Sequence, residues 1–234
     1  MNSFDSLILS LINQFARRSS IFDKFVVLLS TNHLLKGAVI LAVAWWIWFE
    51  NEDVRRKREI LLATMIACLP ALVITQILAR TIYRPRPLNE AGLLFRVPYG
   101  TEAADWVQYS SFPSDHAVLF FALALGIFFA SRRFGWFAFV YVSLFICLPR
   151  VYLGEHYPTD ILAGAAIGMV PVWLASLPSV RNPLTGWALR WMSSRPSQFY
   201  SFSFLVTYLI AELFDPALRI VSFIIRIGYP RMAL

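Results

Sequence analysis

The chain has 234 residues, of which 58% are hydrophobic and only 15% are charged, and its mean hydropathy is +0.60. Soluble domains carry roughly 25% charged residues, so the composition excludes an ordinary soluble domain and predicts an integral membrane protein. The net charge of +7 does not indicate nucleic-acid binding, because the basic residues lie in loops between apolar runs.

Residues 1–33 mix apolar clusters with Arg17, Arg18, Asp23 and Lys24, a pattern too interrupted to cross a membrane. We interpret this segment as an interfacial helix. The start of the chain has no basic region followed by a small-residue cleavage site, so no cleavable signal peptide is expected. Residues 34–178 form the predicted membrane core, and residues 179–234 a cytoplasmic loop, a last transmembrane helix and a tail.

Six apolar runs predict an all-α, polytopic helix bundle with about six transmembrane helices. A span requires about 17–25 residues, and three of the runs need flanking residues to reach that length. The runs are Gly37–Phe49, Ile60–Ala79, Ala117–Ala130, Phe134–Pro149, Ile161–Pro178 and Ser197–Ala211.

Basic residues gather in alternate loops between these runs. They are Arg55, Arg56, Lys57, Arg58, Arg132, Arg133, Arg181, Arg190 and Arg195. The positive-inside rule makes these loops cytoplasmic and places the loops Leu88–Phe112 and Val151–Pro158 outside. The outer loop Leu88–Phe112 is long enough to be a lid or a substrate rim.

The second run ends in a cluster of three arginines, Arg80, Arg84 and Arg86, the last followed by Pro87. Guanidinium groups at an outer surface oppose the positive-inside preference and favour an anionic partner such as phosphate. The alternative is that the arginines extend to lipid headgroups.

Pro113, Ser114, Asp115 and His116 stand at the start of the third run. Proline suits the first helical turn, so the backbone N–H groups of Ser114 and Asp115 are expected to face outward as an anion site. Alternatively, the serine and aspartate only cap the helix.

Between the fourth and fifth runs lie Arg150, His156 and Asp160, in a position where charge is costly unless it has a function. A helix that begins near Pro158 carries Asp160 in its first turn. Its carboxylate can then accept a proton from one imidazole nitrogen of His156 and leave the other as a base or nucleophile. The alternative is a carboxylate that only favours the helix N-terminus, beside an interfacial histidine.

The predicted topology brings all three clusters to the outer side, where arginines, a helix N-terminus and two imidazoles suit phosphoryl transfer. No metal site is expected, because His33 is isolated and the acidic residues are too few for a carboxylate cage.

These residues resemble the three-part pattern of the type 2 phosphatidic-acid phosphatase superfamily: Lys-x6-Arg-Pro, Pro-Ser-Gly-His and Ser-Arg-x5-His-x3-Asp. The matching positions are Arg86, Pro87, Pro113, Ser114, His116, Arg150, His156 and Asp160. The chain departs from the pattern at Ala79 in the lysine position, Asp115 in the glycine position and Pro149 in the serine position. The resemblance extends over about Ile60–Pro178.

The resemblance implies that His156 attacks phosphorus and forms a phosphohistidine, with Asp160 holding its ring. His116 would protonate the leaving oxygen and later activate water. Arg86, Arg150 and Ser114, with backbone amides that include that of Asp115, would hold the phosphoryl oxygens. Arg80 would stand in for the missing lysine, and the Asp115 carboxylate would turn away. No cofactor is implied.

Within the superfamily, the segments around His116 and His156 are most similar to bacterial undecaprenyl-diphosphate phosphatases of the bacitracin-resistance type. The resemblance implies recycling of the cell-wall carrier lipid at the outer face of the cytoplasmic membrane. A phosphatidate or phosphatidylglycerophosphate phosphatase is the alternative. A lipid-binding scaffold or transporter would need only the arginines, and not the histidines and Asp160. The expected partners are a lipid phosphate or diphosphate and membrane lipid; oligomeric state is not predicted.

Overall fold

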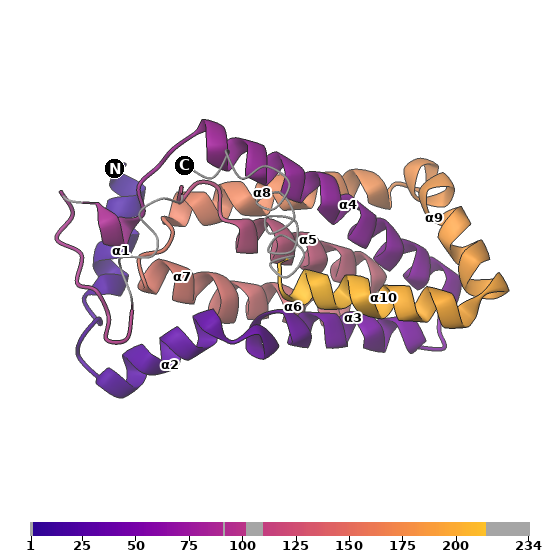
Figure 1. The fold of residues 1–234 in the computed structure, drawn as a ribbon, viewed down its shortest axis with the longest axis horizontal. Coiled ribbons are helices and arrows are strands. Elements are labelled where there is room, and N and C mark those ends of the chain that lie inside the picture. Colours follow the sequence, from indigo (N-terminus) through magenta and orange to yellow (C-terminus); the bar gives the residue numbers. More distant parts are fainter. Residues whose placement is uncertain (1, 91, 102–109, 214–234) are drawn as a thin grey trace, which may run out of the picture.

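The computed structural model describes residues 2–90, 92–101 and 110–213, and this part of the chain is helical, as predicted (Figure 1). Its α-helices are α1 (Ser3–Asn13), α2 (Ser20–Thr31), α3 (Val39–Phe49), α4 (Val54–Thr81), α5 (Asp115–Ala130), α6 (Arg132–Tyr141), α7 (Leu148–Tyr152), α8 (Pro158–Ser176), α9 (Pro178–Ser194) and α10 (Pro196–Ala211). Two π-helical segments, η1 (Leu34–Ala38) and η4 (Val142–Cys147), and a 3₁₀ turn, η2 (Pro87–Asn89), complete them.

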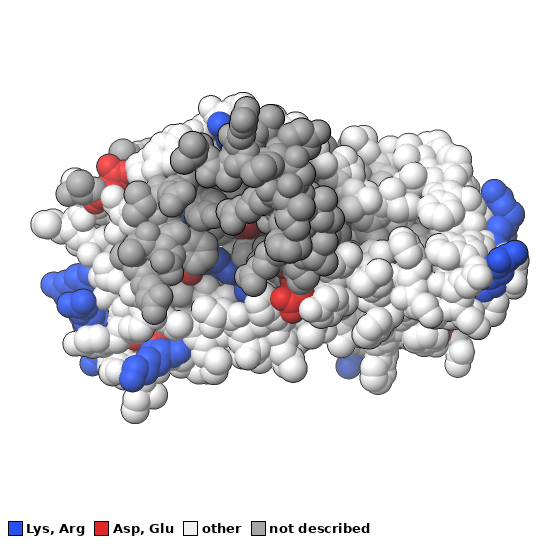
Figure 2. Space-filling model, in the orientation of Figure 1, with Lys and Arg blue, Asp and Glu red and all other residues white. Residues whose placement is uncertain are grey.

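Within the described residues, three helical segments are long and apolar enough to cross a membrane: α4, the continuous segment Arg132–Tyr152, and α8, with 28, 21 and 19 residues. A fourth crossing is possible if α2 and the helix Leu34–Phe49, bent by 68°, count as one span. The protein is therefore a multi-pass membrane protein. In Figure 2 basic side chains gather at the two ends of the long axis, and the surface between them that is not drawn in grey is mostly white.

The sequence predicts six spans, whereas the structure supports three or four by length and hydropathy. All six apolar runs are helical, but α5 and α10 have 16 residues each. At 1.5 Å per residue such a helix is about 24 Å long, less than the roughly 30 Å of a hydrocarbon core.

Helix α5 lies at the centre of the bundle, where it packs against α8, α4 and α6. The approach to α8 is close because Gly164 and Gly168 have no side chains. A Cβ atom added at Gly168 would lie 1.9 Å from the carbonyl oxygen of Val118, and one at Gly164 would lie 2.7 Å from that of Ser114. Small residues four positions apart on one helix face permit this close approach of two helices.

The N-terminal helices pack on the bundle near the outer loop. Helix α1 contacts α7 and α8, and α2 contacts α7 and η4. Asn13 exchanges two 2.8 Å hydrogen bonds with the backbone of Arg96, and Asp23 accepts one from the backbone N–H of Tyr99. The N-terminal segment therefore holds the first part of the loop expected to be a lid or rim; residues 102–109 of that loop lie outside the described residues.

Candidate active site

The site lies where the C-terminal ends of α4 and α7 approach the N-terminal ends of α5 and α8. Two contacts join the second and third motifs: the backbone N–H of Ser114 donates to the carbonyl oxygen of Asp160 at 3.3 Å, and Arg150 contacts His116. The structure therefore brings together residues that are more than thirty positions apart in sequence.

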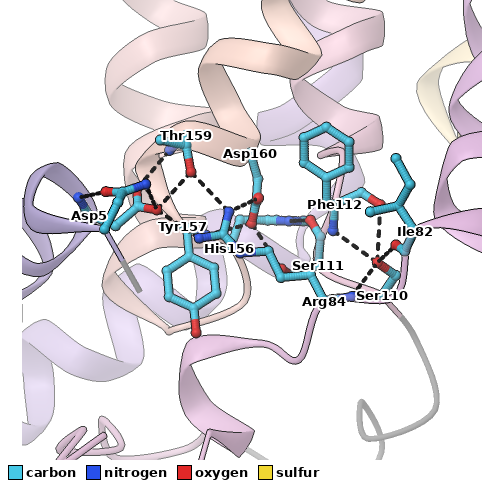
Figure 3. Close-up of polar contacts among 11 residues, drawn as sticks. Asp5, Ile82, Arg84, Ser110, Ser111, Phe112, His156, Tyr157, Thr159 and Asp160 are labelled. Atoms are coloured by element: carbon cyan, nitrogen blue, oxygen red, sulfur yellow. Dashed lines mark hydrogen bonds and ion pairs between the residues drawn. The ribbon is translucent and has the colours of Figure 1, made fainter.

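His156 follows α7 in the loop before α8 and is only 2% exposed. Its Nδ1 lies 2.7 Å from the carbonyl oxygen of Ser111 (Figure 3). A carbonyl oxygen only accepts, so Nδ1 carries the proton and Nε2 keeps its lone pair. Burial lowers the pKa of His156 to about 3, and the charge of Arg86 adds to this effect. The ring is therefore neutral at physiological pH, with an unprotonated Nε2.

Asp160 does not hold the His156 ring directly, and this expectation needs correction. Among the described residues, its carboxylate accepts hydrogen bonds from Arg84 at 2.5 Å, from Ser111 Oγ at 2.9 Å and from the backbone N–H of Tyr157 at 2.8 Å. The physical reason is the short side chain, which reaches back to the start of its own helix. Asp160 therefore acts on His156 through Ser111.

His116 is held between a carboxylate and a guanidinium group. Its Nε2 lies 2.7 Å from Nη2 of Arg150, and its Nδ1 lies 2.8 Å from Oδ1 of Asp115. An arginine only donates, so Nε2 accepts and Nδ1 donates its proton to Asp115. The Asp115 carboxylate, which was expected to turn away, instead fixes the tautomer and orientation of His116.

Arg150 is 6% exposed and joins several elements. Besides His116, it donates to the Glu155 carboxylate and to the carbonyl oxygen of Ser30. Burial raises the pKa of Glu155, but the charge of Arg150 and the two histidines outweigh this effect and bring the pKa below its usual value. The buried Nε of Arg150 has no hydrogen bond within the described part of the chain, so this donor is available to a phosphoryl oxygen.

The three arginines at the C-terminal end of α4 and just beyond it have different environments. Arg86 is 8% exposed, and burial lowers its pKa while Glu155 and Asp115 oppose the shift. Arg84 binds Asp5 and Asp160, two carboxylates without exposed surface. Arg80 is exposed in the last turn of α4, and no described contact joins it to either histidine. A phosphate-binding role for Arg80 remains a prediction.

Ser114 performs the capping role that was considered as an alternative. It is fully buried, and its Oγ accepts a hydrogen bond from the backbone N–H of Ala117. Pro113 precedes this N-cap, so the expectation that it opens the first helical turn is wrong. The Ser114 N–H is also not free to bind an anion, because it donates to Asp160, and α5 packs too closely on α8 to leave it open.

Sequence reasoning missed Asp5, Ser111 and Glu155, and it expected Arg84 to bind an anion such as phosphate, whereas Arg84 binds two carboxylates. Arg84 and Glu155 belong to the clusters that were singled out, and their charge was the available signal. Ser111 acts partly through a carbonyl group, which every residue has, and Asp5 lies far away in sequence. Nothing in their local patterns distinguishes these two.

A family model described as "PAP2 superfamily" matches residues 58–182, more than half of the chain. The chain is 26% identical to "Undecaprenyl-diphosphatase BcrC" of Bacillus subtilis over 159 residues, 68% of this chain and 76% of that protein. It is 29% identical to "Putative undecaprenyl-diphosphatase YbjG" of Escherichia coli over 58% of this chain and 64% of that protein. It is 34% identical to "Lipid A 1-phosphatase" of Rhizobium etli over 41% of this chain and 40% of that protein. No solved structure matches the chain.

Proposed function

Since the chain belongs to the PAP2 superfamily of lipid phosphatases, we propose that it hydrolyses a polyprenyl diphosphate, of the undecaprenyl type, through a phosphohistidine on His156. The observation that carries the proposal is the hydrogen bond between His156 Nδ1 and the carbonyl oxygen of Ser111. It leaves Nε2 unprotonated beside the guanidinium groups of Arg86 and Arg150, so a nucleophile adjoins the groups that attract its anionic target.

In the first step, Nε2 of His156 attacks the terminal phosphorus and forms an N–P bond. The bond from phosphorus to the bridging oxygen breaks, and His116 gives a proton to that oxygen. The carbonyl oxygen of Ser111 keeps accepting from Nδ1 and stabilises the positive ring. Arg86 and the free Nε–H of Arg150 donate to the phosphoryl oxygens, which gain charge in the transition state.

In the second step, His116 takes a proton from water and the resulting oxygen attacks phosphorus. The N–P bond breaks, inorganic phosphate leaves, and His156 returns to its neutral form. Asp115 supports both steps, because its carboxylate stabilises the imidazolium form that His116 has before the first step and after the second. In that form Nε2 carries a proton, so Arg150 Nη2 no longer donates to it and donates to the phosphoryl group instead. A lipid monophosphate is the other product.

The substrate assignment is supported by the names of the Bacillus and Escherichia relatives. A glycolipid phosphate is a second candidate, because the lipid A 1-phosphatase match has a higher identity over a shorter segment. Undecaprenyl diphosphate, lipid A and phosphatidate, assayed in parallel in detergent, should rank in that order of kcat/KM. A preference for phosphatidate would contradict the polyprenyl assignment.

The catalytic assignment is tested by trapping acid-labile phosphate on the enzyme. The His156→Ala variant should form no phosphoenzyme and lose about 10³-fold or more in turnover. His116→Ala should still be phosphorylated when the leaving group is good, but should hydrolyse the intermediate slowly. Label on His156→Ala and none on His116→Ala would reverse the two roles, and no label on the wild type would indicate direct attack by water.

We also propose six spans in the cytoplasmic membrane, in which α5, α10 and the bent pair of α2 and Leu34–Phe49 add to the three long helical segments, and an active site that faces outward. The basic residues Arg55–Arg58 lie at the N-terminal end of α4, the opposite end from the site, and support this orientation. This placement suits an enzyme that recycles the cell-wall carrier lipid.

A further inference from the structure

The carboxylate of Asp5, in the first turn of α1, is fully buried although the helix lies at the periphery of the bundle. It accepts hydrogen bonds from the backbone N–H of Thr159 at 2.9 Å and from Thr159 Oγ1 at 2.7 Å. Arg84 Nη2 donates to the same carboxylate at 2.7 Å. Two of these contacts are to the first turn of α8, which also carries Asp160.

Arg84 connects this carboxylate to the catalytic loop. Its Nη1 lies 2.5 Å from Asp160 Oδ1, and its guanidinium carbon lies 3.8 Å from the ring centre of Tyr157, the residue after His156. A guanidinium group shared by two buried carboxylates and stacked on a ring has little freedom to move. Figure 3 shows Arg84 between Asp5 and Asp160.

From Arg84, two routes lead to Ser111. The carbonyl oxygen of Arg84 accepts from the Ser111 backbone N–H at 2.8 Å, and the Asp160 carboxylate accepts from Ser111 Oγ at 2.9 Å. The carbonyl oxygen of Ser111, in turn, accepts the Nδ1 proton of His156 at 2.7 Å. The position of Arg84 therefore decides where Ser111 lies, and Ser111 decides where the nucleophilic nitrogen points.

We propose that Asp5 is a positioning residue for the proposed phosphatase reaction, so that α1 belongs to the catalytic apparatus. By fixing Arg84 from the side opposite Asp160, it holds Ser111 and the His156 ring in the attacking orientation. Asp5 lies outside residues 58–182 that match the family model, so this support is provided by a part of the chain that the match does not cover. The inference rests on the proposed function of His156.

The test is Asp5→Asn in the full-length protein. Both carboxylate oxygens of Asp5 accept hydrogen bonds, whereas the side-chain nitrogen of asparagine only donates. In either orientation of the amide, this nitrogen meets a donor of Arg84 or Thr159, so one of the two links breaks. We expect kcat for polyprenyl diphosphate to fall by about 10-fold to 100-fold, because a small misplacement of a nucleophile is costly. KM should change less than about threefold, because the phosphate-holding groups of Arg86 and Arg150 do not contact Asp5.

The matched control is Asp23→Asn. Asp23 is another fully buried carboxylate of the N-terminal helices, bound to the backbone of Arg17 and Tyr99 and to the Tyr152 hydroxyl, without a contact to Arg84. Both variants should melt at lower temperature than the wild type, but kcat per folded molecule should fall much more in Asp5→Asn. Equal losses of kcat would reduce the role of Asp5 to general stability and overturn the proposal.

Two further measurements keep the test decisive if Asp5→Asn folds poorly. The first compares kcat of Arg84→Lys with kcat of the double variant Arg84→Lys, Asp5→Asn. The second substitution should lower kcat little further, because both changes break the same connection; additive losses of kcat would contradict the proposal.

The second measurement uses ¹⁵N-histidine spectra, in which the Nδ1 proton of His156 should exchange faster with water in Asp5→Asn than in Asp23→Asn. An unchanged spectrum with unchanged kcat overturns the positioning role, whereas a wild type without phosphohistidine overturns the proposed function instead.

Discussion

The two histidines of the site are held in the same tautomer by acceptors of different charge. Nδ1 of His156 donates to a neutral carbonyl oxygen, whereas Nδ1 of His116 donates to a carboxylate. A carboxylate stabilises an imidazolium ion more strongly than a carbonyl group does. This difference suits His116 to carry a proton and His156 to remain neutral until it attacks.

The protonation of His156 can be measured directly because the chain has only three histidines. We expect its Nε2 to stay unprotonated down to about pH 4, since burial, and then Arg86, lower its pKa to about 3. Titration of ¹⁵N-histidine-labelled protein checks this, with His33→Gln and His116→Gln as assignment controls. A midpoint near pH 6.5 for His156 would contradict the buried, neutral nucleophile.

The same shift gives the stability a pH dependence. The unfolded chain takes up a proton on His156 near pH 6.5, whereas the folded protein takes it up only near pH 3. Between these values the unfolded state binds more protons, so the free energy of unfolding should decrease as the pH falls. Urea unfolding in detergent at pH 7 and pH 5 measures the change, and His156→Gln should reduce it.

Asp115 is the second residue whose role can be isolated. Asp115→Asn removes the charge beside Nδ1 of His116 but keeps nearly the same shape, so we expect kcat to fall by about 10-fold or more and phosphoenzyme to accumulate. Quenched-flow trapping with labelled substrate measures both quantities. If the intermediate does not accumulate, Asp115 does not assist the hydrolysis step.

At the scale of elements, the site depends on how closely α5 approaches α8. Gly168→Ala should destabilise the protein by about 1–3 kcal/mol, because the added Cβ atom meets the backbone of α5 and neither helix can yield without moving the site. Gly186→Ala in α9 is the matched control, since its Cβ atom would meet only the end of Arg190 at 3.5 Å. Thermal unfolding of both variants in detergent should show a loss for Gly168→Ala alone.

At the scale of the molecule, the proposed catalytic groups lie at one end of the bundle, so the proposed orientation is testable with one probe. A cysteine at Gly92 projects into open space, and the native Cys68 and Cys147 are buried. In intact cells, Gly92→Cys should react with a membrane-impermeant maleimide. Labelling that requires cell lysis would place the active site on the cytoplasmic side.

Turnover should also survive chelation, because in the proposed mechanism the charge of the phosphate is met by Arg86 and by the unpaired Nε–H of Arg150 and not by a metal ion. Activity measured after EDTA treatment, with and without added Mg²⁺, checks this expectation. Loss with EDTA and recovery with the ion would favour a carboxylate and metal mechanism.

The sequence by itself determined the helical class and the membrane location, and it singled out the residues that we propose carry the chemistry. Apolar runs specify helices because backbone groups in lipid must be paired internally. Arg86, Arg150, His116 and His156 stand out because charged and titratable groups are costly between such runs. These signals are local and need no knowledge of the neighbours in space.

Only the tertiary structure decided which hydrogen-bond partner orients each side chain of the site. Sequence spacing favoured Asp160 as the direct partner of His156, but the fold puts the Ser111 carbonyl there and turns Asp160 toward Arg84. Asp5 joins the same network from 155 positions away. The physical reason is that hydrogen bonds depend on the direction and distance of individual atoms, which helix packing fixes and residue order does not.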